Sequence, residues 1–359
     1  MTPRVARREA KESMSNKSYC LIIVMALLVG LAPSAGCVGK TSVGASRPQP
    51  SSSQAATATP GASAPVTATS GVAPNPAVDR PMTFAVIGGY GTNNRHERAV
   101  ANLVATRRPD FVITTGDNYY TEAGGSQTGR YDNSAGQYYG MWMKDISTTG
   151  SRYPVGAAAI NGFFPTLGNH DYSDSSHGVG NYLTYFNLPG AGFTNSSANE
   201  RYYDFVQGPV HFFVLNSNTE EPDGVDPAGR QARWLRRQLA ASTSTWNVVY
   251  FHHSPYTSGS LHPSVAYMRW PFAAWGADAV MSGHSHTYER IMRDGIVYFV
   301  NGLGGAERHN FGAPVEGTAA RYNSHWGAQI VRVTDTGMAF EFYNTSGRLI
   351  DSYQLPAAP

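Results

Sequence analysis

The chain has 359 residues, of which 41% are hydrophobic, enough for one large α/β domain with appendages or for two domains. Lysine and arginine number 27 and aspartate and glutamate 25, so a formal charge of +2 gives no sign of the basic surface that nucleic-acid-binding proteins carry, and no nucleic-acid partner is expected. The two cysteines, Cys20 and Cys37, both precede the predicted folded part. A disulfide within the fold, a cysteine zinc site and an iron–sulfur cluster are therefore excluded.

The first 80 residues are predicted to be a targeting segment and a tether. Residues 1–37 combine a basic stretch, an apolar run at 20–32 that is too short to span a bilayer comfortably, and small residues, which is typical of a signal peptide. Cys37 ends a stretch that resembles a bacterial lipobox, so we expect an exported, lipid-anchored protein of the cell envelope, with secretion as the alternative. Membrane contact would be confined to this segment. Residues 38–80, rich in Ser, Ala, Thr and Pro, are predicted to be a disordered tether.

Residues 81–359 are predicted to form one α/β domain. It opens with a strand at 83–87, a helix at 97–107 and a strand at 111–115, a βαβ unit whose strands should pair in parallel. Further strands are expected at 163–167, 211–215, 246–251, 278–281 and 296–300. Helices are expected at 228–241 and 265–275, and closing antiparallel strands at 328–334, 338–343 and 349–353.

Four of the predicted strands end in polar residues that suit metal ions. These segments are Gly116-Asp117-Asn118-Tyr119-Tyr120, Gly168-Asn169-His170-Asp171, His252-His253-Ser254-Pro255 and Ser282-Gly283-His284-Ser285-His286. Because ligands bind beyond the carboxyl ends of strands in open α/β sheets, we expect them to converge on one site. Asp, Asn, His and Tyr are suitable ligands for Zn, Fe or Mn. Each segment alone is more typical of a turn or a surface pair, but the four in order predict a metal site.

This mixture of side chains predicts a centre with two metal ions. Two ions about 3.5–4 Å apart can hold a phosphoryl group and activate water for attack on it. Asp117 is the carboxylate that can bridge both ions. His170 can reach the substrate instead of a metal, with Asp171 orienting its ring. The neutral ligands are Asn169, His252, His284 and His286.

In this order the segments resemble the motifs of the calcineurin-like metallophosphoesterase superfamily, and within it the purple acid phosphatase branch. The matching blocks are Gly-Asp-x-x-Tyr at 116–120, Gly-Asn-His-Asp at 168–171, Val-x-x-His at 249–252 and Gly-His-x-His at 283–286, followed by Tyr288-Glu289-Arg290. The resemblance covers about 82–355. It implies a four-layer α/β/β/α sandwich and metal-dependent hydrolysis of small phosphate esters.

The resemblance also implies a role for each matching residue. The first ion, usually ferric iron, would be held by Asp117, Tyr120 and His286. The second ion, Zn, Mn or Fe, would be held by Asp117, Asn169, His252 and His284. Asn169 and His170 would bind the phosphate, and His170 or His262 would protonate the leaving group. His253 would lie behind the ligands or at the rim. No site role is expected for His96, His177, His211, His309 and His325.

One block departs from the family. The family's Gly-Asp-Tyr-Gly reads Gly88-Gly89-Tyr90-Gly91, so Gly89 stands where an aspartate would bind the first ion. Water or His96 could fill the gap, the second ion could act alone, or the chain could bind metal or phosphate without turnover. A recent single-codon lesion would leave the same sequence.

Three functions are therefore compatible with the sequence. We expect an acid phosphatase-like phosphomonoesterase. A catalytically impaired phosphatase that serves as a metal- or phosphate-binding or interaction protein is the alternative that Gly89 favours. A nuclease or cyclic-nucleotide phosphodiesterase on the same fold is disfavoured by the Gly-Asp-x-x-Tyr block and by the absence of a basic patch. Two long loops, 118–136 and 172–200, are expected to select the substrate. The sequence gives no oligomeric state.

Overall fold

The structure is a computed structural model that describes residues 81–124, 129–144, 146, 158–172 and 178–357. The predicted signal peptide and tether lie outside the described residues. No helix in the described part of the chain combines the length and the apolar character needed to cross a membrane.

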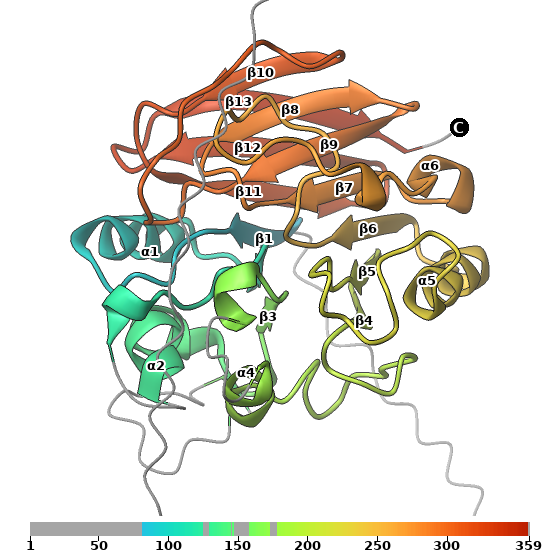
Figure 1. Ribbon diagram of the computed structural model, residues 1–359, viewed down its shortest axis with the longest axis horizontal. Coiled ribbons are helices and arrows are strands. Elements are labelled where there is room, and N and C mark those ends of the chain that lie inside the picture. The colour runs from blue at the N-terminus through green and yellow to red at the C-terminus, as the bar shows by residue number, and fades with distance from the viewer. Residues whose placement is uncertain (1–80, 125–128, 145, 147–157, 173–177, 358–359) are drawn as a thin grey trace, which may run out of the picture. The chain divides into compact units, whose positions relative to one another are not determined.

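Two mixed β-sheets lie at the centre of the domain (Figure 1). One sheet has the strand order β13-β12-β11-β1-β2-β3 and the other β10-β8-β9-β7-β6-β5-β4. In the first sheet β1, β2 and β3 are parallel, and in the second β5, β6, β7 and β9 are parallel. The bounds are β1 Met82–Ile87, β2 Phe111–Thr114, β3 Phe163–Pro165, β4 Tyr203–Gln207, β5 Val210–Val214, β6 Trp246–Tyr250, β7 Ala279–Ser282, β8 Tyr288–Arg293, β9 Ile296–Asn301, β10 Thr318–Tyr322, β11 Gly327–Thr334, β12 Gly337–Asn344 and β13 Leu349–Pro356.

Helices cover the outer faces of the two sheets (Figure 1). On one side α1 packs its buried Val100 and Val104 against the first sheet, and the Asn94 side chain caps its amino end. On the other side α5 packs Trp234 and Leu235 against the second sheet. The helices are α1 Arg95–Arg107, α2 Gly129–Tyr131, α3 Gln137–Tyr139, α4 Gly180–Tyr185, α5 Arg230–Ala241 and α6 Phe272–Trp275. The predicted four-layer α/β/β/α sandwich is confirmed.

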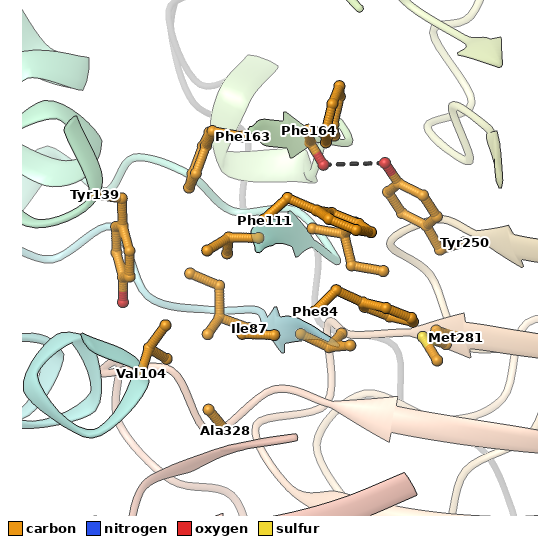
Figure 2. Packing of buried hydrophobic residues seen from close by; sticks show 14 of the residues in the cluster. Phe84, Ile87, Val104, Phe111, Tyr139, Phe163, Phe164, Tyr250, Met281 and Ala328 are labelled. Atoms are coloured by element: carbon orange, nitrogen blue, oxygen red, sulfur yellow. Dashed lines mark hydrogen bonds between the residues drawn. The ribbon is translucent and has the colours of Figure 1, made fainter. Parts of the chain in front are cut away.

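Alternate residues of each strand point into the space between the sheets, and many of these buried side chains are aromatic. Phe84 and Phe111 stack at 5.2 Å, and both meet Phe212 of the facing sheet edge to face, at 5.2 and 5.5 Å. Figure 2 shows Phe84 and Phe111 pointing toward the second sheet, where the Tyr250 hydroxyl donates to the carbonyl of Phe164 at 3.0 Å. This packing fixes the two sheets to one another and aligns their carboxyl ends.

The predicted elements differ from the observed ones in three places. A continuous helix over 265–275 is wrong: the chain makes a short turn at Ala266–Met268 and then α6, because Pro271 lacks an N–H and disfavours helical backbone at the residue before it. The two long loops contain the short helices α2 and α4, and α3 directly follows the first of them. Strands β4, β8 and β10 are additional to the prediction.

Candidate metal centre

The polar segments predicted to converge do meet where the carboxyl ends of the two sheets adjoin. Hydrogen bonds cross between the sheets at this edge: Thr115 donates its hydroxyl to the carbonyl of Asn301 at 2.8 Å, and Thr166 donates its own to the carbonyl of Leu215 at 2.6 Å. The side chains that follow β2, β3, β6 and β7 are therefore brought to one place from both sheets.

The first cluster of this site is centred on Nε2 of His252. Because a carbonyl oxygen can only accept, the 2.7 Å contact with the carbonyl of Thr115 places the proton of His252 on Nδ1 and leaves a lone pair on Nε2. That lone pair faces Asn169 Oδ1 at 3.0 Å, His284 Nδ1 at 3.0 Å and Asp117 Oδ2 at 3.4 Å. Of these four neighbouring atoms, only His284 Nδ1 can carry a hydrogen, and the others present lone pairs to one another. A bound cation would satisfy these lone pairs.

A second cluster lies beside the first and shares Asp117 with it. The hydroxyl of Tyr120 is 2.9 Å from Asp117 Oδ2 and 2.9 Å from His286 Nε2. His286 donates its Nδ1 proton to the carbonyl of Glu307 at 2.6 Å, so its Nε2 also carries a lone pair. The single hydrogen of Tyr120 cannot satisfy both neighbours. The surplus of lone pairs favours a cation here too.

The spacing of these donor atoms fits metal ions. Ligand atoms that surround an ion at about 2.1 Å lie roughly 3.0 Å apart in an octahedral site and roughly 3.4 Å apart in a tetrahedral one. The separations in the two clusters run from 2.9 to 3.4 Å. The residues present therefore fit two ions that share Asp117, and the cluster around His252 has more ligand atoms than the cluster around Tyr120.

The ionisation states of the site also suit metal binding. Burial lowers the pKa of His252, and it lowers the pKa of His286 to about 4, so both imidazoles are neutral. Burial by itself raises the pKa of Asp117, but the nearby histidines, led by His252, outweigh it and hold that pKa below its ordinary value. Burial, and to a smaller extent the negative charge of Asp117, raises the pKa of the Tyr120 hydroxyl, so this group keeps its proton when no cation is bound.

The backbone at the site adopts conformations that place these side chains inward. Asp117 and His284 have φ of 55° and 64°, the left-handed region that few residues other than glycine occupy. Such conformations persist where the surrounding structure enforces them, commonly at functional sites. Gly168 is required for closeness, since a Cβ there would lie 2.2 Å from Asp117 Oδ1.

Gly89 opens directly toward the second cluster. Its φ is +58°, and a Cβ at this position would lie 2.9 Å from Cδ2 and 3.0 Å from Nε2 of His286. A side chain at residue 89 would thus enter the site beside His286, as the resemblance implies for the missing aspartate. The His96 ring does not supply a replacement: the contacts found for it are with Arg95 and with Trp326, on which it stacks at 3.4 Å.

The two histidines predicted to act on the substrate lie on the two clusters. The His170 ring lies 4.2 Å from that of Tyr120, and the His262 ring lies 3.9 Å from that of His284. Asp171 was expected to orient the His170 ring, but the hydrogen bonds found for its carboxylate are with other groups. The Asp171 carboxylate accepts hydrogen bonds from two backbone amides and two side chains. Its burial, and to a smaller extent the negative charge of Asp117, raises its pKa to about 7. The donors are Gly168 N, Asn118 N, Asn118 Nδ2 and Tyr131 Oη.

Two further histidines belong to the site. The ligand atoms of His253, His252 and His284 lie within 4.8 Å of one another, a position compatible with the place expected for His253 behind the ligands. His309 accepts a hydrogen bond from the His286 amide at 3.0 Å and stacks on its ring at 4.1 Å. No signal in the sequence distinguished His309. His177 lies outside the described residues.

Glu289 anchors the loop that carries His262. Its carboxylate is fully buried and accepts from the Ser258 amide at 2.7 Å and the Thr318 hydroxyl at 2.8 Å, as well as from the Ser258 hydroxyl. We expect Glu289→Gln to lower the free energy of unfolding by about 2 kcal/mol, because an amide group would face donors with a donor of its own. Urea unfolding would measure this, with Glu316→Gln, an exposed carboxylate, as the matched control. Equal stability of both variants would contradict the assignment.

The chain is similar in sequence to two named acid phosphatases. The chain is 26% identical over 259 residues to purple acid phosphatase 15 of Arabidopsis thaliana, covering 63% of this chain and 45% of that protein. It is 24% identical over 306 residues to tartrate-resistant acid phosphatase type 5 of Homo sapiens, covering 77% of this chain and 91% of that protein. The chain thus spans less than half of the plant relative and nearly all of the human one.

Solved structures and a family model define the fold family. GAP50, described as the anchor in the inner membrane complex of Plasmodium, superposes with a TM-score of 0.57 at 18% identity, over 78% of this chain and 90% of that one. Purple acid phosphatase PPD1 of yellow lupin superposes with a TM-score of 0.59 at 16% identity, over 77% of this chain and 53% of that one. The model of the calcineurin-like phosphoesterase family matches residues 82–288, and the chain belongs to that family.

Proposed function

We propose that this chain hydrolyses phosphate monoesters in a metal-dependent reaction, as an acid phosphatase-like enzyme. The observation that carries the proposal is the pair of lone-pair clusters around His252 Nε2 and Tyr120 Oη, which share Asp117 Oδ2. Family membership and the purple acid phosphatase relatives imply a dinuclear metal centre, and the two clusters supply the donor atoms for one. The predicted leader would place this activity at the cell envelope.

Each cluster would hold one ion. The ligands of the first ion would be Asp117, Tyr120 and His286, and those of the second Asp117, Asn169, His252 and His284. We propose iron in the first position and Zn, Mn or Fe in the second. Bound there, the ions supply Lewis-acid polarisation of the phosphoryl group and activation of water.

The protein's own groups position the reactants. The carbonyls of Thr115 and Glu307 fix the ring orientation of His252 and His286, and the His170 amide donates to Asp117 Oδ1 at 3.1 Å, so these ligands are set before substrate arrives. The His170 ring would bind a phosphoryl oxygen together with the Asn169 side chain. His262, or His170, would give a proton to the leaving oxygen.

A binding protein without turnover is the competing function, and Gly89 is the observation that favours it. The first position lacks the family's anionic side chain, so its ion would be held by three protein groups rather than four. GAP50, which has the same fold, is described as an anchor. The chain would then bind metal or phosphate and act through its surface.

Hydrolysis of two nitrophenyl esters separates the proposed activity from the diesterase alternative. We expect metal-loaded protein to cleave 4-nitrophenyl phosphate at least about tenfold faster than bis(4-nitrophenyl) phosphate, and chelation of the metal to abolish both rates. Initial rates with Fe, Mn and Zn, with a chelated sample as the blank, would provide the measurement. A faster rate on the diester would contradict the monoesterase assignment.

A further inference from the structure

A cavity of about 360 Å³ opens beside the candidate metal centre. It is lined by Ser260, Leu261, Glu307, Arg308, His309 and Asn310. His309 is the wall that the cavity shares with the centre: its ring lies 4.1 Å from the ring of His286 and 4.9 Å from that of His262. A group attached to a phosphoryl moiety in the centre would therefore meet this cavity next.

The walls of the cavity are held in place before any ligand binds. Its two loops are joined by the Ser260 amide and hydroxyl, which donate to the Asn310 carbonyl at 2.9 and 3.0 Å, and by a β-bridge between Gly259 and Phe311. The loop that carries Ser260 is also held by Glu289, whose buried carboxylate accepts a hydrogen bond from the Ser258 amide. A preformed cavity loses little ordering entropy on binding, which favours a specific role.

Two adjacent residues of opposite charge line this cavity. Glu307 and Arg308 both line it with exposed side chains, and within the described residues neither forms an ion pair. One nitrogen of Arg308, Nη1, donates to the carbonyls of Asn323 and Ser324, and the guanidinium lies 4.7 Å over the Trp326 ring. These contacts hold the guanidinium in one place, and within the described residues no hydrogen bond is found for its Nε or Nη2, the atoms that a carboxylate would use.

An apolar group completes the lining. Leu261, which is 62% exposed, presents an apolar side chain at the mouth of the cavity. The cavity therefore offers an apolar contact, a fixed cation and an adjacent carboxylate. A ligand that uses all three contacts would have an apolar chain that ends in an anionic group next to a cationic group.

We propose that this cavity binds the leaving group of the substrate, and that the preferred substrates are phosphomonoesters whose alcohol carries an α-amino acid head. Arg308 binds the carboxylate of that head, Glu307 binds its ammonium group, and Leu261 packs against the chain between the head and the ester oxygen. The proposal rests on the proposed phosphomonoesterase function and names the substrate class for the same site.

A matched pair of aryl esters tests the proposal. O-phospho-L-tyrosine and 4-methylphenyl phosphate share their aryl ester and differ in the amino acid head. We expect kcat/KM to be roughly tenfold higher for O-phospho-L-tyrosine, the effect of one charge-assisted contact at a partly exposed site. Arg308→Gln should reduce that ratio to near one. Arg321→Gln is the control, because Arg321 also donates to a carbonyl, that of Gly312, and lies over an aromatic ring, but does not line the cavity.

The outcomes separate the cavity from the chemistry. Equal kcat/KM for the two esters, or a ratio that Arg308→Gln leaves intact, would overturn the substrate class while leaving the phosphomonoesterase function in place. If neither ester were hydrolysed, the proposed function would fail, and calorimetric binding of L-tyrosine would decide the cavity alone. Binding of L-tyrosine that Arg308→Gln weakens about tenfold, with 4-methylphenol not binding, would support it. No binding of L-tyrosine would overturn it.

Discussion

His252→Ala should reduce phosphomonoester hydrolysis by about 10³-fold or more and remove the tightly bound metal. Loss of groups that merely orient a metal ligand costs about 10- to 100-fold, and His252 Nε2 is the atom on which the first cluster converges, so its removal should cost more. Steady-state hydrolysis of 4-nitrophenyl phosphate and the metal content of the dialysed protein would both be measured.

Two further variants make this result interpretable. His325→Ala removes an exposed histidine outside both clusters and should leave rate and metal content unchanged. Because His252 is fully buried, its alanine variant could fold poorly. Asn169→Ala provides the same test, since it removes a part-buried amide whose oxygen, a candidate metal ligand, lies 3.0 Å from His252 Nε2. Full activity of a folded Asn169→Ala protein that has also lost its metal would contradict the account.

Gly89→Asp should convert the weaker cluster into a firm second metal position. Aspartate tolerates the left-handed backbone of residue 89 better than most residues, and its carboxylate would enter beside His286. The His286 ring must move by a few tenths of an ångström, since Cβ would otherwise lie 2.9 Å from its Cδ2. An added anionic ligand should tighten binding of the ion at Tyr120 and His286, the first ion, by about 10- to 100-fold, the range known for groups that support a metal site.

Gly89→Asn is the matched control for charge. It introduces the same shape and the same displacement of His286 without an anionic oxygen. Metal content at limiting free ion, measured for the three proteins, should rise toward two ions per chain only for Gly89→Asp. An equal rise for Gly89→Asn would show that negative charge is not what the position lacks, and no rise for either variant would show that residue 89 does not serve a metal.

The sequence predicted the fold and most of the site because both depend on local order along the chain. Asp117, His252 and His284 each follow a strand directly, and parallel strands end at a common edge, so their meeting could be inferred. The parallel pairing of β1 and β2 followed from the short βαβ connection.

The parts that were missed depend on long-range folding. His309 reaches the site because its loop returns to His286 from 23 positions further along the chain, and Glu289 holds Ser258 across 31 positions. Neither of these long-range contacts can be inferred from the spacing of nearby residues in the sequence. The helix wrongly predicted over 265–275 shows the opposite error, in which a helical apolar pattern was given more weight than Pro271.

A titration that records bound metal and hydrolysis in the same sample would separate a metal-dependent enzyme from a protein that only binds metal. The protein, stripped of metal, would receive Mn, Zn or Fe in steps, with bound ion and the rate on 4-nitrophenyl phosphate measured at each step. We expect turnover to appear with the most tightly bound ion, held at the His252 cluster, and to rise in proportion to the occupancy of that cluster. Saturation of that cluster without any turnover would contradict the enzymatic function and leave a metal-binding protein on a phosphoesterase fold.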